Sequence, residues 1–187
     1  QPIFHRSDIY SCSIQFEYTP TDIAWNVDKF IIGYGGLGSE NGSIQLLLEG
    51  NSADPNVLIK AQKSFDGIIS TMGIVSGTMT VGVTYKIIVN RDAQEGRLNV
   101  YIYNINNPQP QMPSLTITDD SIKTIPGNYG FSSYAGDFTL DNLIVSQYNS
   151  MFPITGRAPL FQEAFNNNNT TSVTANANSQ TGSSLSV

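Results

Sequence analysis

The residues best suited to binding chemistry surround Trp25, the single tryptophan of the chain. Asp22, Asn26 and Asp28 accompany it in one polar segment. An indole face can pack on the C–H surface of a sugar, while amides and carboxylates bond to its hydroxyl groups. The sequence therefore predicts a ligand site at these four residues, with Tyr34 beside a glycine-rich turn as a further member. In the alternative interpretation, Trp25 is a lid that closes one end of the domain.

Tyr101 and Tyr103 form a further aromatic pair, two residues apart in a segment with strand-like alternation. Side chains two residues apart point to the same face of a strand, and here they share the face opposite the apolar positions. Such tyrosines are also a third candidate for a sugar platform. The alternative is that they pack against a loop or a neighbouring molecule.

Asp137, Asp141 and Asn142 are the candidate metal ligands, at and just beyond a predicted turn. Calcium, the ion that these oxygens suit, requires six to eight oxygen ligands, so neighbouring loops would have to contribute more. In the alternative, Asp141 and Asn142 bond to nearby backbone amides and cap the turn. The absence of a dense DxDxDG pattern favours capping. No cofactor other than calcium is suggested.

Groups that could support catalysis are sparse. Retaining glycosidases place two carboxyl groups about 5 Å apart, which one strand achieves with an ExD spacing. None of the five glutamates has an aspartate two residues later. His5 is the single histidine and has no partner for a nucleophile–base pair. The sequence thus predicts a protein that is not an enzyme, with a glycosidase of scattered carboxylates as the alternative.

Composition narrows the classes of partner. The 187 residues include 9 basic and 15 acidic side chains, which gives a net charge of −6. A sparse negative charge without a Lys/Arg cluster argues against nucleic acid and anionic membrane surfaces. No apolar run is long enough for a membrane-spanning helix, so no direct membrane insertion is expected. Because Cys12 is the single cysteine, the core must hold the fold without a disulfide within the chain.

Alternation with a period of two residues predicts an all-β chain of about twelve strands or slightly more, with virtually no helix. The expected strands are 10–18, 29–34, 43–49, 57–61, 68–75, a long hairpin at 85–104, 114–118 and a closing pair at 128–147. The expected core residues are Cys12, Ile14, Phe16, Ile44, Leu46, Ile87, Val89, Leu98, Val100, Phe138 and Leu140.

The order of these segments resembles the concanavalin A-like, laminin G-like sandwich family. The resemblance rests on a buried strand with a glycine (Phe30–Gly33), an LxVxI strand (Leu98–Ile102) and an FxLDNxxV strand (Phe138–Val145). It implies an all-β, antiparallel two-sheet jelly-roll sandwich over residues 1–150, and a calcium ion that such modules often hold on a loop edge. The family's opening LFxExF strand is missing before Tyr10.

A segment of that missing type, LFQEAF at 160–165, lies instead near the end of the chain. We expect residues 151–187 to be a polar C-terminal extension. It would complete the sandwich or pair with a neighbouring domain or subunit, through residues 158–187. Its Leu160, Phe161 and Phe165 would be buried and would cover an open edge beside Tyr10–Tyr18.

These features predict a non-catalytic recognition module, extracellular or at a cell surface, that binds a glycan or surface polymer. It would belong to a larger adhesin or polysaccharide-processing protein. The alternative is a structural subunit of a surface filament, virion or tail fibre, assembled as a homo-oligomer partly through strand addition by the tail. The Trp25 segment favours the first hypothesis, and the polar tail favours the second.

Overall fold

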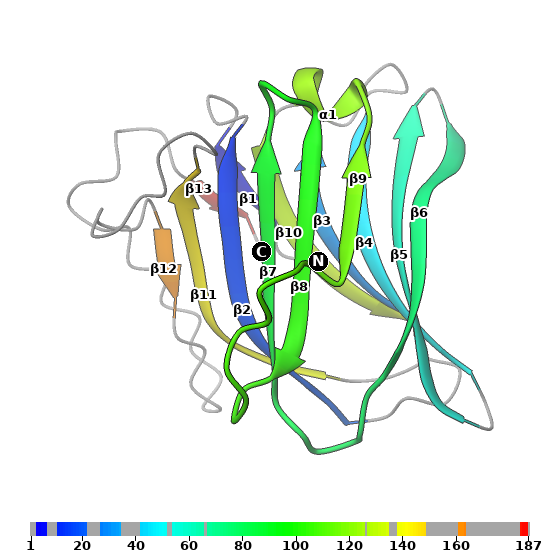
Figure 1. Cartoon of the computed structure of the whole chain (residues 1–187). Helices are drawn as coiled ribbons and strands as arrows, with labels where there is room; N and C mark the ends of the chain where they lie inside the picture. The colour runs from blue at the N-terminus through cyan, green and yellow to red at the C-terminus, as the bar shows by residue number, and fades with distance from the viewer. Residues whose placement is uncertain are drawn as a thin grey trace.

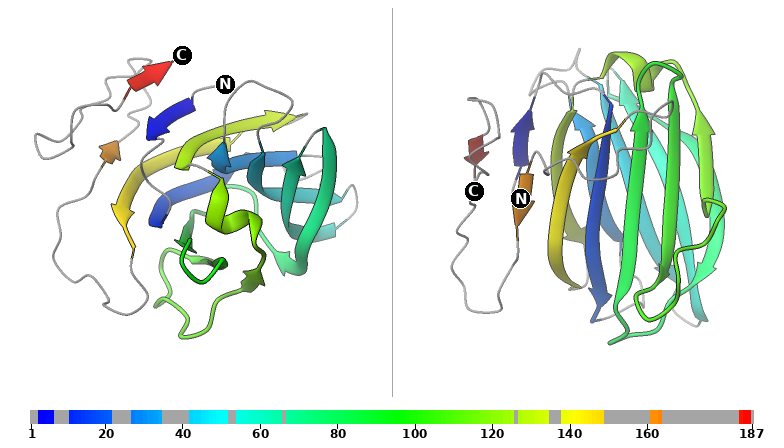
Figure 2. Two further views of the ribbon diagram at one scale, coloured as in Figure 1. Left: turned by 90° about the horizontal axis from the view of Figure 1, so that it is seen from above. Right: turned by 60° about the vertical axis from the view of Figure 1, so that its left-hand side comes forward.

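The computed structural model describes residues 3–6, 11–21, 27–34, 42–51, 54–65, 67–125, 127–134, 138–148, 161–163 and 184–186. Within these ranges the chain is a sandwich of two antiparallel β-sheets with one short helix (Figure 1). The two layers face each other when the molecule is viewed from above (Figure 2). The predicted all-β, two-sheet architecture is confirmed. The described residues contain no helix with the length and apolar character needed to span a bilayer.

The first sheet has seven strands, all paired antiparallel. Their spatial order is β13 (Ser184–Ser186), β1 (Ile3–Arg6), β10 (Gly127–Tyr134), β3 (Val27–Tyr34), β4 (Ser43–Asn51), β5 (Asp54–Phe65) and β6 (Ile68–Thr78). The sheet therefore ends in the short β13 on one side and in the long β6 on the other.

The second sheet has six strands. Their order is β12 (Phe161–Glu163), β11 (Phe138–Gln147), β2 (Cys12–Pro20), β7 (Tyr85–Asp92), β8 (Arg97–Asn104) and β9 (Leu115–Thr118). The short helix α1 (Ser121–Thr124) follows β9. The predicted hairpin at 85–104 is present as β7 and β8, joined by a turn at residues 93–96.

The core lies between the sheets, where one face of each sheet directs its apolar side chains toward the other sheet. The predicted core residues are buried, apart from Phe138, which is partly buried and packs against the same cluster. At one end, the rings of Phe16, Tyr18, Phe30 and Phe138 pack together, with centroids 4.7 Å apart for Phe16 and Phe30 and 5.5 Å apart for Tyr18 and Phe138. Burial on this scale is the main source of stability for a chain without disulfides.

The two strands predicted at 128–147 are present, but the prediction that they pair with each other is wrong. β10 lies between β1 and β3 in one sheet, whereas β11 lies between β12 and β2 in the other. The chain thus crosses from one layer to the other between these strands. Alternation shows that each of the two strands has one apolar face. Two such faces can contact the same core from opposite sheets, so alternation does not show whether the strands pair.

The strands on either side of Gly67 are longer than predicted. β5 begins at Asp54 and ends at Phe65, and β6 continues to Thr78. The sequence prediction ended these strands where large apolar residues become sparse. Main-chain pairing continues beyond that point, because β5 lies between two neighbours and bonds to both along most of its length.

The prediction of an open edge beside Tyr10–Tyr18 is also wrong. β2 is an interior strand, paired with β11 on one side and β7 on the other. A strand does precede it, since β1 lies in the seven-stranded sheet. The described parts of the C-terminal extension pair within the chain, β12 with β11 and β13 with β1. The side chains of Leu160, Phe161 and Phe165 lie outside the described residues.

Candidate functional site

Three of the predicted site residues, Asp22, Trp25 and Asn26, lie outside the described residues, and so does Asp137. The strand residues that flank these two segments are nevertheless partners. Pro20 pairs with Phe138, and Val27 pairs with Tyr134. Because Tyr18 and Asp28 are also bonded across the two sheets, these described strand residues lie at the same end of the sandwich.

Asp28 belongs to β3 rather than to the preceding loop. Its side chain is on the inward face with Phe30 and Ile32, and it has no solvent exposure. The hydroxyl group of Tyr18 donates a hydrogen bond to Oδ2 of Asp28 at 2.6 Å. In this structure Asp28 thus supports the end of the sandwich from within and does not face a ligand in solvent.

The Tyr18 hydroxyl keeps its proton under all ordinary conditions. Burial is the larger cause that raises the pKa of Tyr18 above its ordinary value, and the hydrogen bond to Asp28 adds to it. The phenol is consequently a fixed donor to the buried carboxylate.

Tyr34 ends β3 and pairs with Ser43, and the direction of its side chain lies outside what the structure describes.

Asp141 and Asn142 lie at an irregularity in the pairing of β11 with β2. Asn142 adopts a positive φ of 51° there, a conformation that asparagine tolerates better than most residues. Its backbone N–H donates to Oδ1 of Asp141 at 2.7 Å, and its side-chain amide donates to Oε2 of Glu17 at 2.8 Å. The first bond, from a backbone amide to the Asp141 carboxylate, is of the kind that the capping alternative describes, whereas the second joins two side chains. The described part of the chain contains no group of three or more His, Cys, Asp or Glu residues that could hold a metal ion.

The outward residues of the six-stranded sheet form a second candidate surface, which we call the tyrosine face. It consists of outward-facing residues of β2, β7 and β8, namely Gln15, Glu17, Lys86, Ile88, Asn90, Asn99, Tyr101 and Tyr103. These side chains alternate with the core residues of the same strands. All except Ile88 are partly exposed.

The strand register arranges the tyrosine face in rows. Tyr103 lies opposite Lys86, which lies opposite Glu17. Nζ of Lys86 is 3.9 Å from Oε1 of Glu17, so the two charges are paired across the strands. In the next row, Tyr101 lies opposite Ile88. An aromatic group, an apolar group and a compensated pair of charges therefore lie within two adjacent rows.

Two asparagines extend the tyrosine face on the other side of Tyr101. Asn90 lies opposite Asn99, and Oδ1 of Asn99 accepts a hydrogen bond from the Thr116 hydroxyl at 3.0 Å. Each amide carries both donors and acceptors. The sequence prediction singled out the two tyrosines but missed these polar neighbours, because it gave the hairpin at 85–104 without the register that sets Asn90 opposite Asn99.

Tyr148 is a third tyrosine near this surface. Partial burial raises its pKa above the ordinary value, with smaller contributions from Asp92 and Tyr101, while Arg97 acts in the opposite direction. Partial burial also raises the pKa of Tyr103. The sequence prediction missed Tyr148. The signal that could have found it is the alternation of Ile144, Ser146 and Tyr148, which continues the outward face of β11 past its last strand residue.

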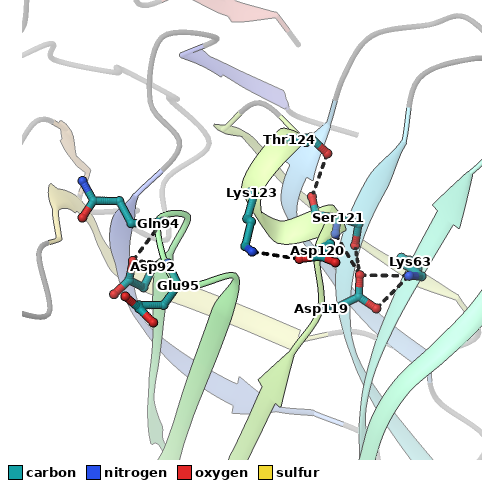
Figure 3. Close-up of polar contacts among 9 residues, drawn as sticks. All are labelled: Lys63, Asp92, Gln94, Glu95, Asp119, Asp120, Ser121, Lys123 and Thr124. Atoms are coloured by element: carbon teal, nitrogen blue, oxygen red, sulfur yellow. Dashed lines mark hydrogen bonds and ion pairs between the residues drawn. The ribbon is translucent and has the colours of Figure 1, made fainter.

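A separate polar cluster lies around α1 and the turn between β7 and β8 (Figure 3). Nζ of Lys63 contacts both carboxylate oxygens of Asp119, at 2.9 and 2.7 Å, and the backbone N–H and hydroxyl of Ser121 donate to Oδ1. Partial burial alone would raise the pKa of Asp119, but these hydrogen bonds outweigh it and lower the pKa below its ordinary value. Asp92 similarly accepts from the backbone of Gln94 and Glu95. Both carboxylates fix backbone turns.

No protein-family model and no curated protein matches the sequence. Among solved structures, the fold is similar to that of the carbohydrate-binding module CBM66 from Bacillus subtilis, with a TM-score of 0.50 and 10% sequence identity over 72% of this chain and 74% of that one. It is also similar to sheep galectin-11 in complex with glycerol, with a TM-score of 0.50 and 10% identity over 76% of this chain and 95% of that one. At this identity the likeness establishes the β-sandwich fold alone.

Proposed function

We propose that the chain is a non-catalytic glycan-binding module that acts outside the cell or at a cell surface, as part of a larger adhesin or polysaccharide-processing protein. The observation that carries this proposal is the tyrosine face. Tyr101 and Tyr103 project from one strand beside amide and charged side chains, on a rigid sheet whose opposite face is the core. The likeness of the fold to a carbohydrate-binding module and a galectin supports the same function.

The chemistry of the tyrosine face suits a neutral or weakly charged sugar. Tyrosine rings pack on the C–H surface of a pyranose, and their hydroxyl groups add polar contacts at the rim. Asn90, Asn99 and Gln15 supply amides that both donate and accept hydrogen bonds. Tyr101 and Tyr103 lie ~7 Å apart along the strand, at about 3.3 Å per residue, so one extended ligand can contact both.

Trp25, Asp22 and Asn26 are proposed as a second contact region. They follow Pro20 in the sequence, and Pro20 pairs with Phe138 at one end of the sandwich. Asp28 would support this region from the core through its bond with Tyr18. A ligand long enough to reach from Tyr103 to this end would contact both regions, since Tyr103, Lys86 and Glu17 lie in the row just before the β2 residues Tyr18–Pro20.

Glycan-array binding with single substitutions tests the proposal. Tyr101→Ala and Tyr103→Ala should each weaken retention about tenfold, or about 1.4 kcal/mol, while the unfolding midpoint changes little because both side chains are partly exposed. Thr118→Ala, on the exposed face of β9, is the matched control and should retain full binding. A wild-type chain that binds no glycan on a broad array would reject the proposed function.

A separate variant, Trp25→Ala, tests the second contact region. Loss of glycan retention with an unchanged unfolding midpoint would support a platform role for Trp25. A destabilisation of about 3 kcal/mol or more, as for truncation of a buried aromatic residue, would instead show that Trp25 is part of the core. This outcome would leave the tyrosine face as the proposed site.

The alternative function, a structural subunit of a surface filament, virion or tail fibre, is favoured by one specific observation. β6 is a long strand at the edge of the seven-stranded sheet, and Ile68, Ile69 and Ile74 are exposed on it. A self-associating edge of this kind can supply one contact of an assembly, and a filament would need a second, different contact. The molar mass of the isolated chain in solution, beside its glycan binding, separates the two functions. Open-ended assembly without glycan binding would favour the structural subunit.

A further inference from the structure

The edges of the two sheets differ greatly in length. β13 and β12 have three residues each and β9 has four, whereas β6 has 11. A strand at an edge presents a row of unpaired N–H and C=O groups, and proteins commonly limit this hazard by keeping edge strands very short. Among the described edge strands, β6 alone is long.

The side chains around β6 are also unusual for a solvent-exposed edge. Six of the eight exposed large hydrophobic residues in the described ranges lie on β5, β6 and the turn that follows, namely Leu58, Phe65, Ile68, Ile69, Ile74 and Val81. Ile68 is 71% exposed and Ile74 is 52% exposed. Concentrated apolar exposure of this kind marks an interaction surface.

β6 also has no charge to prevent pairing. Not one residue from Gly67 to Tyr85 is charged, although the chain as a whole has a net charge of −6. Edge strands that must stay unpaired usually carry a lysine or another charged residue as a guard. The neutral stretch therefore selects a partner that is itself neutral and apolar at the contact.

The backbone of β6 is held in position for pairing from Gly73 onward. The pairing with β5 shifts register between Ala61 and Gln62, so Met72 is an extra residue that separates two parts of the strand. On the inner face, a Cβ atom at Gly73 would lie 3.0 Å from Cγ1 of Ile117 on β9. β6 thus lies close to the other sheet at Gly73, and its residues 73–78 pair with β5 without a register shift.

We propose that β6 pairs antiparallel with β6 of a second copy of this chain, which joins the two seven-stranded sheets across a two-fold axis. A second copy satisfies the requirement for a neutral, apolar partner, because its contact surface is the same uncharged strand. An isologous contact of this kind also closes on itself and yields a dimer rather than a filament. The dimer is independent of glycan binding at the tyrosine face, which lies on the other sheet.

The register follows from the pleat of the sheet. Directly opposite residues must point to the same face, so residues of the two copies can pair only when both numbers are odd or both are even. A two-fold axis at Val75 places Gly73 opposite Gly77 of the second copy and Ile74 opposite Ser76 of the second copy. This register uses the whole segment 73–77 and avoids the extra residue at Met72. It sets Ile74 of each copy opposite Ser76 of the other copy, with Leu58 on the far side of that serine.

Molar mass in solution tests the proposal directly. Light scattering after gel filtration should give about twice the 20.3 kDa mass of the wild-type chain. Ser76→Lys should yield a monomer, because it sets an ammonium group against Ile74 of the second copy. Ser76 is exposed, so the substitution leaves the core intact. The control Thr118→Lys makes the same charge change on the short edge strand β9 and should leave the dimer intact.

Amide hydrogen exchange supplies the second measurement. The N–H groups of residues 73–78 that point away from β5 should be protected in the wild type, and the protection should fall on dilution or in Ser76→Lys. Added salt should tighten the dimer, because it screens repulsion between two chains of net charge −6 while the contact itself is uncharged. A wild-type chain that is monomeric throughout, or a Ser76→Lys chain that remains a dimer, would overturn the proposal. The second result would place the contact elsewhere, for example in residues 158–187.

Discussion

At the scale of single residues, the bond between Tyr18 and Asp28 explains how a carboxylate survives in an apolar core. A buried polar group is costly unless hydrogen-bonded, and the Tyr18 hydroxyl supplies a donor at 2.6 Å. Tyr18→Phe removes this donor and should lower the free energy of unfolding by about 1–3 kcal/mol. Chemical denaturation at neutral pH measures the change. An unchanged midpoint would show that other partners of Asp28 suffice.

The same bond predicts a dependence on alkaline pH. The pKa of Tyr18 is raised in the folded chain, whereas phenols in the unfolded chain ionise near the ordinary value of 10.0. The unfolded chain therefore loses protons first, and the stability due to Tyr18 is fully present below pH 10 and is lost as the pH rises above it. Tyr18→Phe should make the alkaline loss of stability less steep. An identical slope for both proteins would contradict the prediction.

At the scale of elements, Arg91 holds α1 onto the six-stranded sheet. Its guanidinium group is fully buried in β7 and donates to the backbone carbonyls of Ile122 and Ile125. A helix of four residues cannot hold itself together, so these bonds and the buried Ile122 fix it. Arg91→Met keeps the apolar stem but leaves the carbonyls without their donor.

Arg91→Met should therefore lower the free energy of unfolding by about 2–4 kcal/mol, as measured by urea denaturation. Arg97→Met removes the same charge from an exposed position and should change stability by less than about 0.5 kcal/mol. Equal effects of the two substitutions would show that net charge, rather than the bonds to α1, determines the loss.

At the scale of the whole molecule, the C-terminal extension supplies an edge strand to each sheet. β12 covers β11, and β13 covers β1. Deletion of residues 158–187 would expose both strands as unpaired edges. The truncated chain should aggregate or lose cooperative unfolding, as followed by light scattering and thermal denaturation. A truncated chain that stays soluble and equally stable would show that the extension acts only as a linker.

The strands and the core were predictable because each depends on local alternation. Leu98, Val100 and Ile102 point to one face of any strand, whichever sheet that strand joins, and the apolar face must be buried. The same reasoning identified Tyr101 and Tyr103 as outward side chains. The single cysteine in the composition showed that the core must hold the fold without a disulfide within the chain.

The partner of each strand was decided only by the tertiary structure. β10 and β11 are adjacent in the sequence but lie in opposite sheets, and β2 is interior although the missing LFxExF strand predicted an open edge beside it. Pairing depends on which layer each strand enters, and alternation does not encode the layer. For the same reason Tyr103, Lys86 and Glu17 form a row that no sequence spacing reveals, and Asp28 is a buried acceptor because Tyr18 faces it from the other sheet.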